Sequence, residues 1–159
     1  MDDLAIARAL HVLAVVLWIG GVGLVTTALL PALRRLPDAA QGAALFAAVE
    51  RRFGMQARGS VLLAGLSGLY LLIRLDAWHR FTSLPYWWMH AMVLVWGIFA
   101  LVLFVLEPFV LHRRFAARAA RDSDAAFRTL HRVHVVLLLL SLLTILGAVA
   151  GSNGALLFG

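Results

Sequence analysis

Four long apolar runs constrain the fold of this 159-residue chain more than any other feature of its sequence. They cover residues 4–33, 58–75, 86–111 and 133–150. About 20 apolar residues cross the hydrocarbon layer of a bilayer as a helix, because each backbone polar group there must be satisfied within its own segment. The sequence therefore predicts an all-α integral membrane protein. We expect residues 1–159 to form one domain, an up-and-down bundle of four transmembrane helices.

The arginines are divided unevenly among the connections, which predicts how the bundle is oriented. All 14 basic residues are arginine, and eleven of them fall in the first and third connections. Basic residues near short loops stay on the cytoplasmic side, so both termini are expected on the periplasmic or extracellular side. Four aromatic residues would mark that outer interface: Trp78, Tyr86, Trp87 and Trp88. Topology and anionic lipid thus explain the net charge of +6, and no nucleic-acid partner is expected.

The two basic connections are predicted to contain helix of their own. In the first, a turn at residues 36–38 precedes an amphipathic stretch in which Phe46, Val49 and Phe53 recur at helical spacing. That stretch is expected to form a helix that lies at the second span or continues into it. In the third, we expect a helical extension and then a new helix capped at Ser123 or Asp124. The N-terminus begins Met-Asp-Asp and shows no removable signal pattern, so the first helix is expected to be retained.

The chain has no cysteine, which limits the cofactors that it can bind. Disulfides, thiolate metal sites, iron–sulfur clusters and covalent haem attachment are excluded. Soft or borderline metal ions must then be bound by histidine or methionine. Attention therefore falls on the six histidines.

His11 and His90 are the candidate metal ligands. His11 lies about two turns into the first span from its outer end, and His90 about one turn into the third. In an up-and-down bundle these two helices run parallel and lie diagonally across the core. Two imidazoles at matched depth on diagonal helices suit the axial ligands of haem b. Polar side chains inside a membrane are costly, which favours a functional role over a structural one.

The residues around this histidine pair are compatible with a haem. Glycines remove side-chain bulk where a macrocycle would need space, although small residues also permit ordinary close helix packing. Guanidinium groups match the carboxylates of haem propionates, which Arg8 and Arg74 are placed to bind. The glycines are Gly20, Gly21, Gly23, Gly65 and Gly68.

Several alternatives remain open at this point. Met89 and Met92 flank His90, and thioethers with imidazole suit copper(I), so a copper-binding transport or resistance protein is the second hypothesis. A cofactor-free accessory subunit is the third. His131 and His134, at i and i+3, could form a second site with His112, whereas His79 is expected to be solvated. Glu107, which precedes Pro108, is expected to pair with an arginine of the first connection or to carry protons.

Three stretches resemble a known group of membrane proteins. The first span reads ARALHVLAVVLWIGGVGLV, the third begins WWMHAMVLV, and the fourth is entered by AFRTLHRVHVVLLL. Together they resemble the small four-helix membrane proteins grouped around the copper-resistance D proteins and the HemJ-type protoporphyrinogen oxidases. In these an Ala-Leu-His motif precedes a tryptophan and a glycine pair, which places Trp18 and Gly21 in the candidate cofactor site.

The resemblance implies a b-type haem held partly by the histidine that matches His11, in an oligomeric protein of a bacterial inner membrane. A quinol, a porphyrinogen or a redox protein would be the electron partner. The chain departs from the HemJ pattern at two places. Met92 stands where a lysine is expected, and His131, Arg132 and His134 stand where the pattern has Asn-Glu followed by Pro. Whether the protein is an oxidoreductase is therefore left open.

Overall fold

The prediction of an all-helical chain is confirmed over residues 2–111 and 122–155, which are the residues that the computed structural model describes. The first helix comprises α1 (Asp2–Leu24), the π-helical segment η1 (Val25–Leu29) and α2 (Leu30–Leu33). It is followed by α3 (Ala39–Arg74), by two short 3₁₀ segments, η2 (Ala77–Thr82) and η3 (Leu84–Tyr86), and by α4 (Trp87–Leu101), which continues as the π-helical η4 (Val102–Leu111). The last helix is α6 (Ser123–Ser152).

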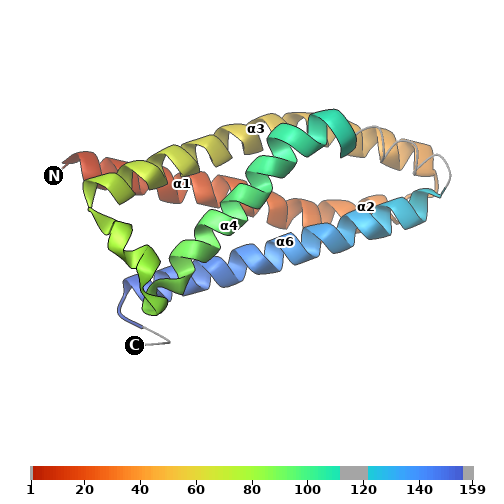
Figure 1. The fold of residues 1–159 in the computed structure, drawn as a ribbon. Helices are drawn as coiled ribbons and strands as arrows, with labels where there is room; N and C mark the ends of the chain where they lie inside the picture. Colours follow the sequence, from red (N-terminus) through yellow and green to blue (C-terminus); the bar gives the residue numbers. More distant parts are fainter. Residues whose placement is uncertain (1, 112–121, 156–159) are drawn as a thin grey trace.

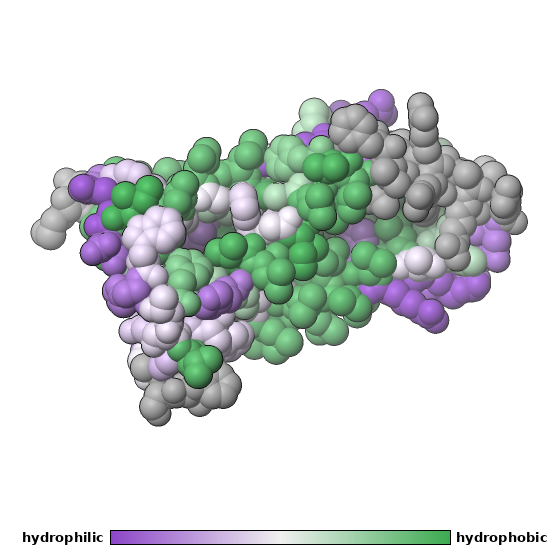
Figure 2. Space-filling view, in the orientation of Figure 1, coloured by the Kyte–Doolittle hydropathy of each residue, from purple (hydrophilic) through white to green (hydrophobic). Residues whose placement is uncertain are grey.

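Four helices are long and apolar enough to cross a membrane, as predicted. The candidate spans are Asp3–Leu33, Gln41–Arg74, Leu84–Glu107 and Asp124–Ser152. Figure 2 shows apolar side chains across the middle of one face, with hydrophilic residues gathered mainly toward the two ends. Figure 1 shows both termini at the same end of the molecule. We call this the N/C end and the opposite one the far end.

The four spans pack as two pairs, α1 with α3 and α4 with α6 (Figure 1). Between the pairs, α4 crosses obliquely, from α6 at the N/C end to α3 at the far end. The oblique path follows from aromatic side chains that lie over glycines. Ideal Cβ atoms at Gly147 and Gly151 of α6 would lie 2.6 Å from Trp87 and 2.2 Å from Trp88. The helix pair α4–α6 is therefore close at the N/C end.

The central core joins α1, α3 and α4. Trp18 and Phe99 meet edge to face with their ring centroids 4.8 Å apart. The indole N–H of Trp96 on α4 donates to the carbonyl of Val61 on α3 at 2.9 Å. Around them are packed buried side chains of three helices: Ala14, Ile19, Val22, Ala64 and Val95. This core holds the first and third spans together near the middle of the molecule.

The helices begin and end somewhat differently from the expected apolar runs. The helix α3 starts at residue 39, because the amphipathic stretch of the first connection continues without a break into the second span, as predicted. Its Phe46 is buried against Phe127 of α6, with ring centroids 6.0 Å apart. The cap of α6 was expected at Ser123 or Asp124 but is Asp122. Its carboxylate accepts from the Ala125 amide at 2.9 Å, because only the residue before the helix has the extended backbone that allows this contact.

Two π-helical segments precede or contain prolines. In η1, the hydroxyls of Thr26 and Thr27 donate to carbonyls four residues back, at 2.7 and 2.8 Å, shortly before Pro31. In η4, the carbonyl of Leu103 would face the amide of residue 108 in the π-helical register, but Pro108 has no N–H to donate. The two widened turns thus coincide with the two places where a proline interrupts the hydrogen bonding of a span.

Candidate functional site

His11 projects from α1 onto α3. Its Nδ1 lies 3.0 Å from the carbonyl oxygen of Ala64 and 3.2 Å from the hydroxyl of Ser67. The Ser67 hydroxyl itself donates to the Leu63 carbonyl at 2.5 Å, so its oxygen is free to accept from the imidazole. A Cβ at Gly68 would lie 3.1 Å from Cε1 of His11, which means that the glycine allows the ring to approach α3. The ring is thus held between two helices.

These contacts determine which ring nitrogen of His11 is available. A carbonyl oxygen only accepts, so Nδ1 must carry the proton, and in the neutral imidazole Nε2 then keeps its lone pair. Histidines that bind metals typically donate their other N–H to a carbonyl or carboxylate, which fixes the tautomer and orients the ring. His11 therefore has the hydrogen bonding of a metal ligand.

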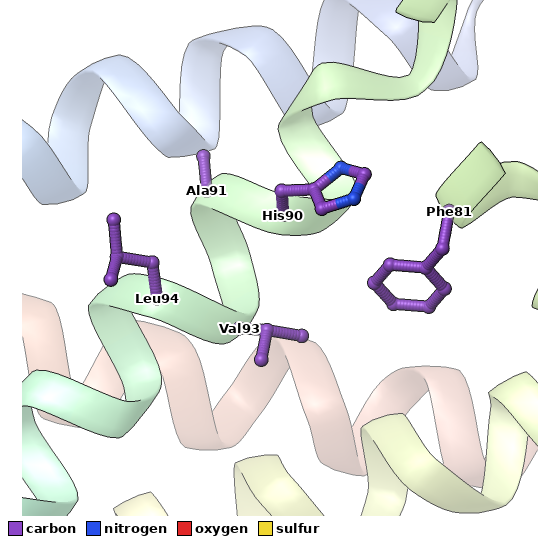
Figure 3. Close-up of a pocket in the computed structure, with 5 residues that line it drawn as sticks. All are labelled: Phe81, His90, Ala91, Val93 and Leu94. Atoms are coloured by element: carbon purple, nitrogen blue, oxygen red, sulfur yellow. The ribbon is translucent and has the colours of Figure 1, made fainter. Parts of the chain in front are cut away.

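His90 lies near the start of α4 and lines an open pocket of about 680 Å³ with an apolar wall. The other lining residues are Phe81 from η2 and Ala91, Val93 and Leu94 from α4. Figure 3 shows the imidazole directed toward Phe81, with the ribbons of α1 and α3 passing below the pocket in this view. The two rings meet edge to face with centroids 5.2 Å apart. His90 is exposed, as are Val93 and Leu94, so this pocket is an open site on the surface of the chain.

The two candidate ligands have different neighbours. His11 is bound to α3, whereas His90 faces η2, and among the described residues the two imidazoles share neither a hydrogen bond nor a ring contact. Within the same residues, no three histidine or carboxylate side chains form a group that could hold a metal ion. The protein side chains alone thus do not form a compact metal cage. His11 is partly buried against α3, whereas His90 is exposed.

The glycines predicted to leave space for a macrocycle are covered by side chains of the chain itself. A Cβ at Gly21 would lie 2.0 Å from Phe53, and one at Gly65 would lie 2.7 Å from Trp96. The Gly68 position faces His11. The space at Gly21 and Gly65 therefore serves helix packing, and of the three glycines only Gly68 contacts a candidate ligand.

Trp18 lies two turns beyond His11 on the same face of α1. It is 4% exposed, and its indole N–H is buried with no hydrogen-bond partner among the described residues. Leaving a buried donor unpaired costs about 1–3 kcal/mol. Trp18 thus packs in the central core and keeps an unpaired N–H on the same helix face as His11.

The two arginines predicted to bind propionates are in different situations. Arg74 donates to Asp3 at 2.9 Å, and Tyr70 donates to the same carboxylate oxygen at 2.8 Å. This network ties the start of α1 to the end of α3 at the N/C end. Arg8 is exposed on α1, one turn before His11. The Arg74 guanidinium is therefore already paired, and Arg8 is not placed by such a contact.

The copper hypothesis required Met89 and Met92 to share a face with His90. Both methionines are partly buried, and neither lines the pocket that His90 lines. Neighbours at i±1 and i±2 point away from each other on a helix, which accounts for the difference. The pocket beside His90 thus brings the imidazole together with apolar side chains and not with these two thioethers.

Among the residues that the structure describes, the remaining histidines belong to no group of three side chains that could hold a metal ion. His134 is partly buried, and its Nδ1 donates to the Leu130 carbonyl at 3.0 Å, while His131 is partly buried one turn earlier on α6. His112, the third member of the predicted second site, lies outside the described residues. His79 is exposed on η2, as expected, and its Nδ1 donates to the Asp76 carbonyl at 3.1 Å.

The predicted pairing of Glu107 with an arginine of the first connection is confirmed. Its partner is Arg58 on α3, at 3.0 Å, and the two side chains are only 15% and 33% exposed. The Nε of Arg58 also donates to the Leu103 carbonyl at 3.1 Å, the one that Pro108 leaves without a backbone donor in the π-helical register. A Cβ at Gly54 would lie 3.1 Å from the carboxylate of Glu107, so the glycine allows the approach.

Two polar side chains near the histidines were missed by the reasoning from sequence. Ser67 accepts a hydrogen bond from His11. The sequence alone does not predict this contact, because it depends on which helices pack against each other. Arg80 precedes Phe81, which lines the pocket of His90, and was not among the predicted site residues. Its position next to Phe81, in a cluster of aromatic residues, was the signal that could have drawn attention to it.

Comparison of the chain with protein-family models, with curated proteins and with solved structures found no match.

Proposed function

We propose that this chain is a multi-pass membrane protein that binds a b-type haem near its N/C end and uses it for electron transfer. His11 and His90 would hold its iron. The observation that carries the proposal is the 3.0 Å hydrogen bond from His11 Nδ1 to the Ala64 carbonyl, because it orients the ring and leaves Nε2 for a metal. When bound, the haem would supply one-electron exchange at its iron.

The protein side chains would contribute binding, orientation and exclusion of water. Ala64 and Ser67 of α3 hold the His11 ring, and Phe81 packs against the His90 ring. The apolar pocket wall beside His90 offers a surface for one face of a macrocycle. Hydrogen bonding of the axial ligand and burial of the group are two means by which a protein adjusts a haem potential.

The proposed setting is a bacterial inner membrane, with the N/C end on the periplasmic side. An electron donor such as a quinol, a porphyrinogen or a redox protein would then approach from that side, and a porphyrinogen donor would correspond to a HemJ-type oxidoreductase. In the third and fourth spans only 11% of the apolar window is buried within the chain, so much of the surface is left for lipid or for a second copy. A homo-oligomer is included in the proposal for this reason.

The test is an absorption spectrum of the detergent-purified protein, oxidised and then reduced with dithionite, with an iron and copper assay on the same sample. We expect a Soret band that shifts on reduction, with split visible bands. His11→Ala and His90→Ala should each lose this spectrum. His79→Ala is the matched control, because His79 also donates from Nδ1 to a carbonyl but is exposed on η2.

A colourless protein after growth with haem supplied would overturn the haem proposal. Copper in that sample would favour the copper-resistance-like alternative, and the absence of both metals would favour a cofactor-free subunit. A haem spectrum that survives both His11→Ala and His90→Ala would show that other residues bind the iron.

A further inference from the structure

Arg80 in η2 has a polar atom without a partner. Its Nε is buried and makes no hydrogen bond among the described residues. The guanidinium carbon lies 5.3 Å from the centroid of the Tyr86 ring, so the group is held over an aromatic face. A cation–π contact holds the plane of the guanidinium but leaves its N–H groups free to donate. A buried donor of this kind calls for an acceptor that the described part of the chain does not supply.

The position of Arg80 relates it to the pocket of His90. The next residue, Phe81, lines the pocket and contacts the His90 ring, with centroids 5.2 Å apart. Tyr86, over which the guanidinium lies, precedes α4 directly, and His90 follows four residues later. Four residues of helix correspond to a rise of about 6 Å. The Arg80 guanidinium is thus associated with the helix about one turn from the imidazole, toward the N/C end.

This combination of side chains selects for a particular ligand chemistry. The pocket offers an apolar wall and one imidazole, and the segment beside it offers a guanidinium with an unused donor. Arginine binds carboxylates with two parallel hydrogen bonds, which gives it both strength and orientation. The ligand that fits is a flat apolar ring that carries a carboxylate on the side facing the N/C end.

The other arginines near the N/C end are less suited to bind the carboxylate of such a ligand. Arg74 already donates to Asp3, whose carboxylate oxygen also accepts from Tyr70. Arg8 is exposed on α1, and within the described part of the chain no aromatic ring lies against its guanidinium. Arg80 is therefore the arginine at this end that combines a fixed guanidinium with an unpaired buried nitrogen.

We propose that Arg80 binds a propionate of the haem whose iron His90 holds, and that it is a positioning residue for the macrocycle. This inference rests on the proposed haem function. The sequence had indicated Arg8 and Arg74 as the propionate partners, and the inference names Arg80 in their place.

The experiment compares haem with its dimethyl ester, in which both propionate charges are masked. The full chain, purified in detergent without haem, is titrated with each compound, and binding is followed by the Soret band. A charge-assisted hydrogen bond is worth about 1.5–3 kcal/mol, so we expect the wild type to prefer free haem by about tenfold or more. Arg80→Gln should bind both compounds with the affinity that the wild type has for the ester. Arg8→Gln and Arg74→Gln should keep the preference.

The possible outcomes separate this inference from the function on which it rests. If the wild type binds neither compound with a haem spectrum, the haem function fails and the role of Arg80 fails with it. If both bind but Arg80→Gln keeps the preference, or Arg8→Gln or Arg74→Gln removes it, the haem function stands and the inference is wrong. Arg80→Lys is the second variant, in case the glutamine variant does not fold. It keeps the charge without the fork of donors, so an intermediate preference supports the inference and an unchanged one contradicts it.

Discussion

Single glycines determine how closely the spans of this protein approach one another. Gly65 of α3 is covered by Trp96, whose ring would lie 2.7 Å from a Cβ at that position. Gly65→Ala should therefore displace the indole and weaken its hydrogen bond to Val61. Overpacking of this kind costs about 1–3 kcal/mol, and we expect a matching loss of thermal stability in detergent. Gly59→Ala on the same helix is the control, because nothing lies within 4 Å of its Cβ position. Equal losses in the two variants would contradict the packing role of Gly65.

A substitution at Ser67 tests the orientation of His11 with a small change to the site. Removing its hydroxyl leaves the Ala64 carbonyl in place, so the ring loses one of its two contacts on α3. Loss of a partner behind a metal ligand typically weakens metal binding by about 10–100-fold. We expect Ser67→Ala to lie at the lower end, near tenfold weaker haem binding in a Soret titration.

A matched control for this variant is Ser141→Ala on α6. Ser141 is also buried, and its hydroxyl also donates to a carbonyl of its own helix, Leu137 at 2.7 Å. Among the described residues, the hydrogen bonds of His11 go to Ala64 and Ser67 and not to Ser141. If both variants weaken haem binding equally, the effect reflects general packing and Ser67 has no role in orienting the ligand.

Among the elements, η4 shows how a side chain on one helix can complete the hydrogen bonding of another. Arg58 satisfies the Leu103 carbonyl and the Glu107 carboxylate together, at 3.1 and 3.0 Å. Removing one member of the ion pair leaves the other charge without its partner in a partly buried place. Because this ion pair is partly buried, its loss should cost more than that of an exposed ion pair and less than that of a fully buried one. We expect Glu107→Ala to lower the free energy of unfolding by about 2 kcal/mol.

The double variant Arg58→Met with Glu107→Ala separates charge from packing. It removes both charges, so no unpaired ion remains, and it should recover part of the stability lost in Glu107→Ala. The measurement is thermal unfolding of the four proteins of the cycle in the same detergent. A double variant that loses the sum of the two single losses would show that the pair is not coupled.

How far the elements could be predicted from the sequence depended on the kind of signal. The apolar runs and the spacing of Phe46 and Phe53 were sufficient for the four spans and for the continuation of the first connection into α3. The cap of α6 was misplaced by one residue because Asp122, Ser123 and Asp124 are all good capping residues. The π-helical turns were not predicted, because their signal, a proline inside a span, is equally compatible with a kink.

At the scale of the whole molecule, the sequence predicted how deep each residue lies in the bilayer. It did not predict the direction in which a side chain points around its helix axis. Counting residues placed His11 and His90 toward the same end, and both lie in the halves of α1 and α4 nearest the N/C end. Which neighbour each imidazole would meet depended on helix pairing, and the oblique path of α4 follows from tryptophans over glycines of α6. Similarly, the space predicted at Gly21 and Gly65 could not be distinguished in advance from packing space for Phe53 and Trp96.

The orientation of the whole molecule in its membrane gives the last prediction. The first connection lies at the far end with its basic residues, and both termini lie at the N/C end. Retention of basic connections on the cytoplasmic side would put the N/C end in the periplasm. Because the chain has no cysteine, a single one can be introduced without background. We expect Asn153→Cys to react with a membrane-impermeant maleimide in intact spheroplasts, and Gln41→Cys to react only after permeabilisation. Both positions are exposed, so access depends on the side of the membrane. The reverse pattern would put the candidate haem site on the cytoplasmic side, where its electron donor would have to be sought.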